Sequence, residues 1–242
     1  MKISLKASGM RLALLLAAGS FSLAVVPLSA QGTFGTTLSG AIAPFTKAAP
    51  GFQTLGQSFM APGVPARLQS FSLSFTNFFN GGALKFDAYL YAFDLANRRL
   101  TGSALWSGTN VAGSANDFDF DLRTFATGNV RLAPSTMYMF LITTSAQGSA
   151  VPDDAANQVG TSSGNEYTGG TLWIAENGSS TGRLLDPNAF TDVGSAEGLD
   201  AAFAATFVVE EQVVPEPATL LLTGAGLVGL VVTARRRRAI AR

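Results

Sequence analysis

Hydrophobic residues along this chain form short runs in its central part and two longer stretches near its ends. Between residues 31 and 214 the apolar runs are short and often aromatic, and clusters of Gly, Asn, Asp and Ser separate them. Short runs divided by turn-forming residues are typical of β-strands. No long segment in this region shows the 3.6-residue period of an amphipathic helix. The pattern therefore predicts a central body made of strands.

Four runs carry the clearest strand pattern: 67–75, 84–93, 137–143 and 202–209. The first alternates polar and apolar residues from position 69 onward, and the third is continuously apolar, as in a buried strand. Residues 31–55 are poorly patterned and are expected to form an edge strand or an arm. Many short strands with turn-rich spacing predict a mainly β fold, an antiparallel β-sandwich of jelly-roll type over residues 31–212.

The apolar stretch near the N-terminus has the form of a secretory signal peptide over residues 1–30. Basic residues precede an apolar run at 12–26, and a small-residue cleavage site ends at Ala30. We expect the general secretion machinery to export the chain and signal peptidase to cut between Ala30 and Gln31. An uncleaved anchor helix is the alternative, but the apolar run is short and contains Gly and Ser.

The apolar stretch near the C-terminus covers residues 218–234 and contains no charged residue. A helix of this length is a marginal but workable membrane span. Four arginines follow it, and the positive-inside rule keeps them cytoplasmic: Arg235, Arg236, Arg237 and Arg238. A GxGxxG pattern at 224–229 lacks the preceding strand and the downstream acid of a dinucleotide site, so it indicates only small residues in a membrane helix. The two ends thus predict one topology, with the body outside and the tail inside.

Pro215, Glu216 and Pro217 stand directly before this apolar segment. Proline fixes φ and cannot donate a backbone hydrogen bond, so the two prolines favour an extended tripeptide. The order of tripeptide, apolar segment and arginine cluster over residues 213–238 closely resembles the PEP-CTERM sorting signal of Gram-negative bacteria. A simple helix-entry turn, with Pro217 near the first helical position, is the alternative.

The resemblance to PEP-CTERM proteins implies recognition by an exosortase, a membrane-embedded cysteine transpeptidase, and cleavage near residues 215–217. It also implies an association with exopolysaccharide and biofilm formation. Within the body, segments 56–62 (GQSFMAP) and 132–138 (LAPSTMY) are similar to parts of the β-sandwich ectodomains common among these proteins. This second likeness implies a jelly-roll shape and no established activity.

Composition narrows the functions that the body can have. The chain contains no cysteine and no histidine, which excludes disulfides, thiol nucleophiles, Ser-His-Asp and Cys-His catalysis, and HExxH zinc sites. Residues 31–214 carry 15 acidic and 8 basic side chains, a net charge of about −7. An acidic body argues against nucleic-acid binding.

Three aspartates in the segment NDFDFDL (116–122) are the sharpest local pattern: Asp117, Asp119 and Asp121. In a strand they would share one face at steps of about 7 Å. Calcium needs ligands folded around one ion, which a straight strand does not provide. A solvated outer face is therefore favoured, with a calcium site as the alternative.

A glycoside hydrolase would need two cooperating carboxylates, and no spacing in the body selects a pair. The acidic residues available in the body are scattered along the sequence: Asp87, Asp94, Asp153, Asp154, Glu166, Glu176, Asp186, Asp192, Glu197 and Asp200. A sugar-stacking platform could use the tryptophans and tyrosines, although such residues more often fill a sandwich core: Tyr89, Tyr91, Trp106, Tyr167 and Trp173.

The sequence thus predicts an exported, non-enzymatic β-sandwich without a cofactor. It is expected to be anchored transiently in the inner membrane before exosortase processing, and then to reside at the cell surface or in the extracellular matrix. Exopolysaccharide is the candidate partner. A carbohydrate-binding module with a defined ligand is the first alternative, and a carboxylate-dependent glycoside hydrolase is the second.

Overall fold

The computed structural model describes residues 30–38, 41–46, 52–76, 84–113, 119–145, 156–163, 166–177, 180–193, 199–210 and 222–227. Its elements are β1 (Ala30–Gly35), β2 (Ala41–Thr46), β3 (Thr54–Met60), β4 (Ala66–Thr76), β5 (Lys85–Asp94), β6 (Arg99–Ala112), β7 (Asp121–Leu132), β8 (Met137–Thr143), β9 (Ala156–Ser163), β10 (Leu172–Ala175), the 3-10 helix η2 (Thr181–Leu185), β11 (Thr191–Asp192), β12 (Leu199–Ala201) and β13 (Phe203–Val209).

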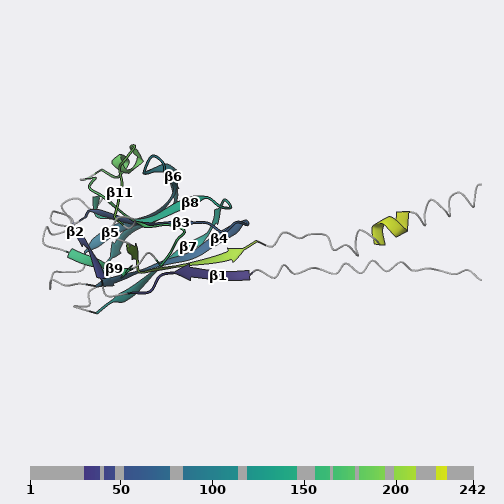
Figure 1. The fold of residues 1–242 in the computed structure, drawn as a ribbon, viewed down its shortest axis with the longest axis horizontal. Coiled ribbons are helices and arrows are strands. Elements are labelled where there is room, and N and C mark those ends of the chain that lie inside the picture. Colours follow the sequence, from purple (N-terminus) through teal and green to yellow (C-terminus); the bar gives the residue numbers. More distant parts are fainter. Residues whose placement is uncertain are drawn as a thin grey trace, which may run out of the picture.

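The strands form two antiparallel sheets that pack face to face as a β-sandwich (Figure 1). The seven-stranded sheet has the order β1-β13-β4-β9-β12, with β2 paired to β9 and β7 paired to β4. The six-stranded sheet has the order β11-β10-β3-β8-β5-β6. The predicted mainly β fold and antiparallel sandwich are confirmed.

All four predicted strands are present, with bounds that differ by one residue at most. The segments at 67–75, 84–93, 137–143 and 202–209 correspond to β4, β5, β8 and β13. The poorly patterned region 31–55 contains β1, an edge strand that pairs with β13, and β2, which pairs with β9. Its last two residues, 54 and 55, begin β3.

A β-bulge at Gln69 explains why the alternation in β4 begins there. The pairings of β4 with β7 and with β13 both shift next to this residue. Leu68 before the bulge and Phe71 after it are both buried in the core, although they are three residues apart and would lie on opposite faces of a regular strand. The extra residue resets the side-chain period.

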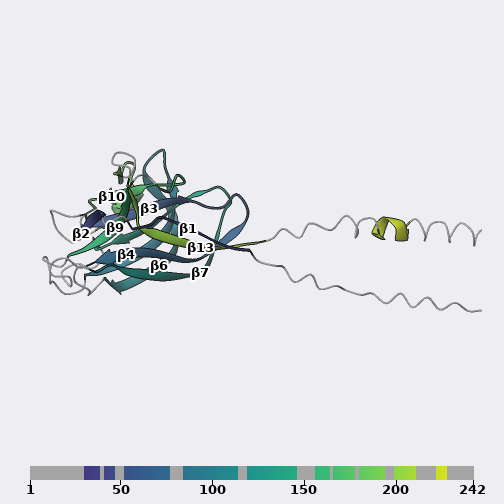
Figure 2. The same ribbon diagram turned by 60° about the horizontal axis from the view of Figure 1, so that its bottom comes forward.

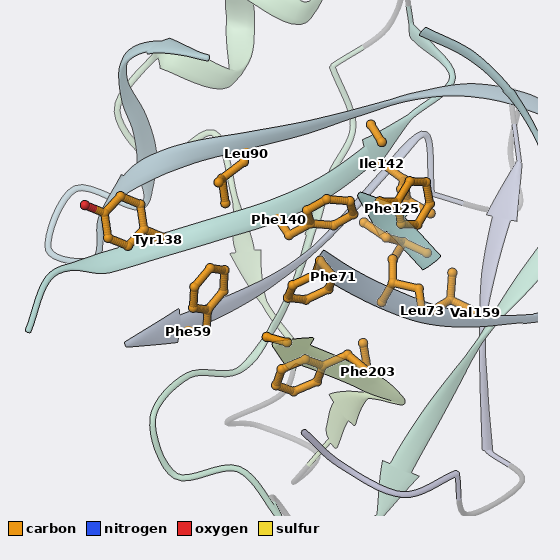
Figure 3. Packing of buried hydrophobic residues seen from close by; sticks show 14 of the residues in the cluster. Phe59, Phe71, Leu73, Leu90, Phe125, Tyr138, Phe140, Ile142, Val159 and Phe203 are labelled. Carbon is orange, nitrogen blue, oxygen red and sulfur yellow. The ribbon is translucent and has the colours of Figure 1, made fainter. Parts of the chain in front are cut away.

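The main core lies between the sheets and is rich in phenylalanine (Figure 3). Phe71 of β4 stacks on Phe140 of β8 at a centroid distance of 4.3 Å and on Phe203 of β13 at 5.3 Å. These three rings join the two sheets at the centre of the sandwich. Fully buried Phe side chains bring about 150–250 Å² of surface each, so they dominate the packing energy.

A second apolar cluster covers the outer face of the six-stranded sheet. Trp173 of β10 and Met139 of β8 pack there with Leu184 of η2 and with Phe190. Trp173 contacts Phe93 edge to face at 5.0 Å. Because β8 is covered on both faces, its continuous apolar run is buried along almost its whole length.

The described part of the C-terminal segment is a short helix at residues 222–227. Within the residues that the structure describes, no helix is long and apolar enough to cross a bilayer. The remainder of the predicted span, 218–221 and 228–234, lies outside the described residues, as does 1–29 of the predicted signal peptide.

Candidate functional site

The sandwich has one end at which its first and last strands meet. β1 and β13 are antiparallel neighbours, with Ala30 opposite Val209 and Gln31 opposite Val208. The start of β1 and the end of β13 therefore lie side by side, as both views show (Figure 1, Figure 2). We call this end the terminal pole. It consists of residues 30–31, 60–67, 130–138 and 208–210.

Glu210, the last described residue of the body, is held in place at the terminal pole by several contacts. Its backbone N–H donates to the Pro65 carbonyl at 2.8 Å. Its carboxylate pairs with Arg67 Nε at 2.6 Å and with Arg131 Nη2 at 3.4 Å. These contacts anchor the chain four residues before Val214 and five before Pro215.

The residues predicted to act in sorting lie outside the described part of the chain: Pro215, Glu216, Pro217, Arg235, Arg236, Arg237 and Arg238. At the predicted signal-peptidase site, Ala30 begins β1. Gln31 follows in the strand, and its side chain donates a hydrogen bond from Nε2 to Gln69 Oε1 at 3.1 Å. Cleavage at either end of the chain stays a prediction.

The three predicted calcium candidates do not share one strand in the described residues. β7 begins only at Asp121, and Asp119 lies in a bend before it, so the expectation of a strand over 116–122 is wrong at Asp119. Asp117 is outside the described residues. Asp121 Oδ2 lies 3.8 Å from Arg123 Nη2. Within the described residues no group of three acidic side chains could hold a metal ion.

Asp200 is the most deeply buried carboxylate among the described residues, with no exposed surface. It accepts hydrogen bonds from Gln57 Nε2 at Oδ1 and from the Tyr167 N–H at Oδ2, both at 3.0 Å. Burial raises the pKa of Asp200, and these two hydrogen bonds oppose that rise. Because the carboxylate of Asp200 is buried and hydrogen-bonded at both oxygens, it links the two sheets and is not accessible to a substrate.

Other acids of the body serve turns and bulges. Asp87 Oδ1 accepts the Asn110 N–H at 2.8 Å, where β6 bulges away from β5. Tyr89 donates its hydroxyl to Asp87 Oδ2 at 3.1 Å, and burial together with the charge of Asp87 raises the pKa of Tyr89 to about 12. In the β5–β6 turn, hydrogen bonds from Asn97 lower the pKa of Asp94.

Glu166 also has a local role, because its carboxylate accepts hydrogen bonds from the Thr37 N–H and hydroxyl. Asp153, Asp154 and Glu197 lie outside the described residues. Four of the described acids therefore have identified structural partners: Asp87, Asp94, Glu166 and Asp200. None of these four forms the open carboxylate pair of a glycoside hydrolase.

The aromatic side chains do not gather into one platform. Trp173 is buried in the outer cluster, and its indole N–H donates to Ser58 Oγ at 2.9 Å. Trp106 packs against the main core, where it stacks on Phe140. Tyr167 stacks on Phe34 at 5.0 Å. Tyr89 and Tyr91 pack against the same outer cluster as Trp173, but they are half-buried, with ring centroids 6.1 Å apart.

Sequence reasoning did not identify the links from Gln57 to Asp200 and from Arg67 and Arg131 to Glu210. The partners in each link are far apart along the chain, and a single sequence carries no signal for such pairs. Gln57 was a visible anomaly, since it is a polar residue between the apolar positions Leu55 and Phe59 on one face of a strand. Such a residue needs a buried hydrogen-bond partner.

Solved structures show only distant similarity to this chain. The Clostridial cysteine protease Cwp84 after propeptide cleavage is 12% identical with a TM-score of 0.47, over 74% of this chain and 40% of that one. The cysteine protease and lectin-like domains of Cwp84 from Clostridium difficile are 15% identical with a TM-score of 0.43, over 65% and 32%. The structure of infectious bursal virus derived T=1 particles is 14% identical with a TM-score of 0.32, over 87% of this chain and 48% of that one.

This chain thus spans less than half the length of these structures, and scores this low assign no function. The sequence matches none of the curated proteins. Its C-terminal segment, however, matches a known family at residues 213–238, directly after the anchored end of β13. This segment is a PEP-CTERM protein-sorting motif, which implies that the chain is exported through membrane-anchored sorting and processed by an exosortase.

Proposed function

We propose that this protein is a non-enzymatic exosortase substrate whose β-sandwich is the exported product. A signal peptide directs export, and residues 218–234 hold the chain in the inner membrane with Arg235–Arg238 on the cytoplasmic side. Exosortase then cleaves near Pro215, Glu216 and Pro217. The released sandwich resides at the cell surface or in the extracellular matrix.

The match of residues 213–238 to the sorting motif is the observation that supports this proposal most strongly. Its position adds further support. Glu210 is bonded to the sandwich, so the tripeptide begins only five residues beyond a folded surface. A connection of this length keeps the tripeptide outside the folded domain and directly before the apolar segment.

A non-enzymatic role agrees with the chemistry of the body. The chain has no cysteine or histidine, so it cannot perform the cysteine-protease chemistry named for Cwp84. Its buried carboxylate Asp200 is enclosed by Gln57 and Tyr167. A role in contact with exopolysaccharide is supported by Tyr89 and Tyr91, the half-buried tyrosine pair on one outer face.

Substitution of Glu216 by Ala tests the sorting function in the native host. Glu216 lies beyond the anchored Glu210, so folding of the body should be unchanged, within about 0.5 kcal/mol. Processing should be blocked, and the full-length chain should accumulate in the inner membrane. Fractionation and immunoblotting with antibody against the body measure both effects.

Glu211→Ala is the matched control, since it removes the same side chain five residues earlier and should be processed normally. Deletion of Arg235 to Arg238 should reduce membrane retention by a different route, because the positive-inside signal is lost. Normal processing and export of Glu216→Ala would show that the tripeptide is not a recognition signal and would refute the sorting proposal.

The polysaccharide role has a separate test. Purified body is applied to an array of bacterial exopolysaccharides, with Tyr89→Ala and Tyr91→Ala as variants. Binding that both substitutions weaken would support contact through the tyrosine pair. Binding that neither variant changes would refute that surface, while the absence of any binding would favour a purely structural role.

A further inference from the structure

The terminal pole is the only end of the sandwich from which a short connection to the sorting motif is possible within the described fold. β1 begins there and β13 ends there. From Glu210 to residue 218 the chain has eight residues, which span at most about 29 Å when fully extended. The opposite end of the sandwich lies one strand length away.

The strand length exceeds that reach. β4 has 11 residues and runs from the terminal pole toward the opposite end. At about 3.3 Å per residue it is about 36 Å long. The chain leaves the sandwich at Glu210, which follows the partner of Ala66 in β13. From there it cannot run along the whole length of the sandwich and still enter a membrane at residue 218. The opposite end cannot face the bilayer while the chain is anchored.

The surface of the terminal pole has few charges and some exposed apolar side chains. The pole is closed by two loops, residues 61–65 and 133–136. Backbone hydrogen bonds join these loops, from the Ala61 N–H to the Thr136 carbonyl and from the Ser135 N–H to the Pro62 carbonyl. Val64 in the first loop is 46% exposed, and Met60 beside it is 38% exposed.

The described residues of the pole leave no acid unpaired that would be repelled by lipid phosphates. Among the described residues of the pole, the charged side chains are Arg67, Arg131 and Glu210. Arg67 and Arg131 lie directly opposite each other on β4 and β7, and both pair with the carboxylate of Glu210. One net positive charge and exposed apolar side chains suit the interface of an anionic bilayer.

We propose that the terminal pole is a membrane-facing surface: while the chain is anchored, the sandwich stands on the bilayer with Val64 and Met60 nearest the lipid headgroups. This proposal rests on the proposed membrane-anchored sorting and adds the orientation of the domain. The opposite end, where Asp121 and Leu122 begin β7, then points away from the membrane.

Energy transfer from the protein to the lipid tests this orientation. Because the chain has no cysteine, Val64→Cys and Leu122→Cys each give one labelling site. Leu122 is 64% exposed and pairs with Ser74, eight residues along β4 from Ala66, or about 26 Å away. The full unprocessed chain is labelled with a donor dye and reconstituted in phosphatidylethanolamine–phosphatidylglycerol vesicles that contain acceptor-labelled lipid.

The dye at position 64 should transfer energy several-fold more efficiently than the dye at position 122. Insertion of a Gly-Ser linker of about 20 residues after Glu210 should remove most of this difference, because a flexible tether no longer restricts the domain. Equal transfer from the two sites, or greater transfer from position 122, would refute the orientation.

Membrane insertion is measured in the same samples by resistance to alkaline carbonate extraction. An extractable chain would contradict the proposed anchoring itself. A chain that resists extraction but gives equal transfer would refute only the membrane-facing pole. Circular dichroism of both substituted proteins confirms that the exposed substitutions leave the β fold intact.

Discussion

Buried polar side chains in this sandwich form specific links where a core of this kind usually has apolar ones. Gln57 of β3 donates to Asp200 of β12 and accepts the Ala201 N–H at 2.8 Å, so it connects the two sheets. Ser58 accepts hydrogen bonds from the Trp173 indole and the Thr171 N–H, both at 2.9 Å. Each buried group that loses its partner would retain its full desolvation cost.

Replacement of Gln57 by Leu should destabilise the sandwich. The change removes one partner of Asp200 and leaves the Ala201 N–H unpaired in the core, a loss of about 1–3 kcal/mol in the free energy of unfolding. Urea unfolding of residues 31–214 measures it. Gln31→Leu is the control, because its hydrogen bond to Gln69 is exposed and its loss should cost about 0.5 kcal/mol or less. Equal losses in the two variants would contradict this role of Gln57.

Asp200 should also give the protein a pH-dependent stability. Burial raises the folded-state pKa of Asp200 above its ordinary value of 3.8. As pH rises, the unfolded chain releases this proton first, so the free energy of unfolding falls between the unfolded and the folded pKa. Asp200→Asn has no proton to release and should lack this part of the fall. Urea unfolding across the acidic range compares the two proteins, and parallel pH profiles would show that Asp200 is not responsible.

Among the elements, β1 is the strand whose pairing defines the terminal pole. In the described sheet it pairs with β13 alone, and Phe34 holds it by stacking on Phe207 at 4.7 Å and on Tyr167. Thr36 continues the attachment, since its hydroxyl donates to the Ala201 carbonyl and accepts the Phe203 N–H. These contacts tie the first strand to the last.

Two glycines in β1 provide a matched test of this pairing. A Cβ at Gly35 would overlap the Phe203 carbonyl oxygen, whereas a Cβ at Gly32 would meet nothing within 4 Å. Gly35→Ala should therefore push β1 away from β13 and cost about 1–3 kcal/mol. Gly32→Ala should be neutral or slightly stabilising. Thermal unfolding measures both, and unchanged stability of Gly35→Ala would contradict the close approach of the strands.

Strands with a long apolar or alternating run could be predicted from the sequence, whereas β3, β10 and β6, whose runs are short or mixed, could not. β4, β5, β8 and β13 carry buried aromatic or aliphatic runs. β6 was missed because most of its side chains are exposed or half-exposed and its residues are those typical of turns. Gly102 and Asn110 adopt positive φ angles inside it, at φ 69° and 55°, where its pairing with β5 shifts. Bulges of this kind interrupt the two-residue alternation of side chains along the strand.

The same distinction applies to the candidate site. The sorting motif is contiguous, so its tripeptide, apolar segment and arginines could be recognised together in 213–238. The pole that presents it could not be predicted, because Glu210 finds Arg67 and Arg131 only after the sheet has formed. Long-range pairs of this type depend on the register of β4, β7 and β13.

For the whole molecule, stability must come from non-covalent packing and hydrogen bonds, since the chain contains no cysteine and therefore no disulfide. The two clusters on either side of the six-stranded sheet provide this packing. Phe140 and Ile142 of β8 belong to the inner cluster, and Met139 and Leu141 to the outer one. A domain of this size can bury enough apolar surface to fold without covalent or metal crosslinks.

Residues 31–214, separated from both ends, should therefore fold as a soluble β-rich monomer without metal or reductant. The net charge of about −7 favours solubility. Circular dichroism and thermal melting with and without a chelator measure this. A spectrum dominated by helix would contradict the prediction, and a melting temperature lowered by chelator would revive a calcium site at Asp117, Asp119 and Asp121.

The pairing of the first strand with the last also determines when the domain can fold during export. A chain that crosses the membrane from its N-terminus delivers β1 early, but β1 has no partner in the described sheet until β13 has crossed. Since β13 also lies between β1 and β4, the seven-stranded sheet cannot be completed before residue 209 emerges. Pairing between such distant segments is slow and leaves strand edges open in the meantime. Closure of the sheet thus coincides with the arrival of residues 213–238 at the membrane, and the timing of folding is linked to the timing of sorting.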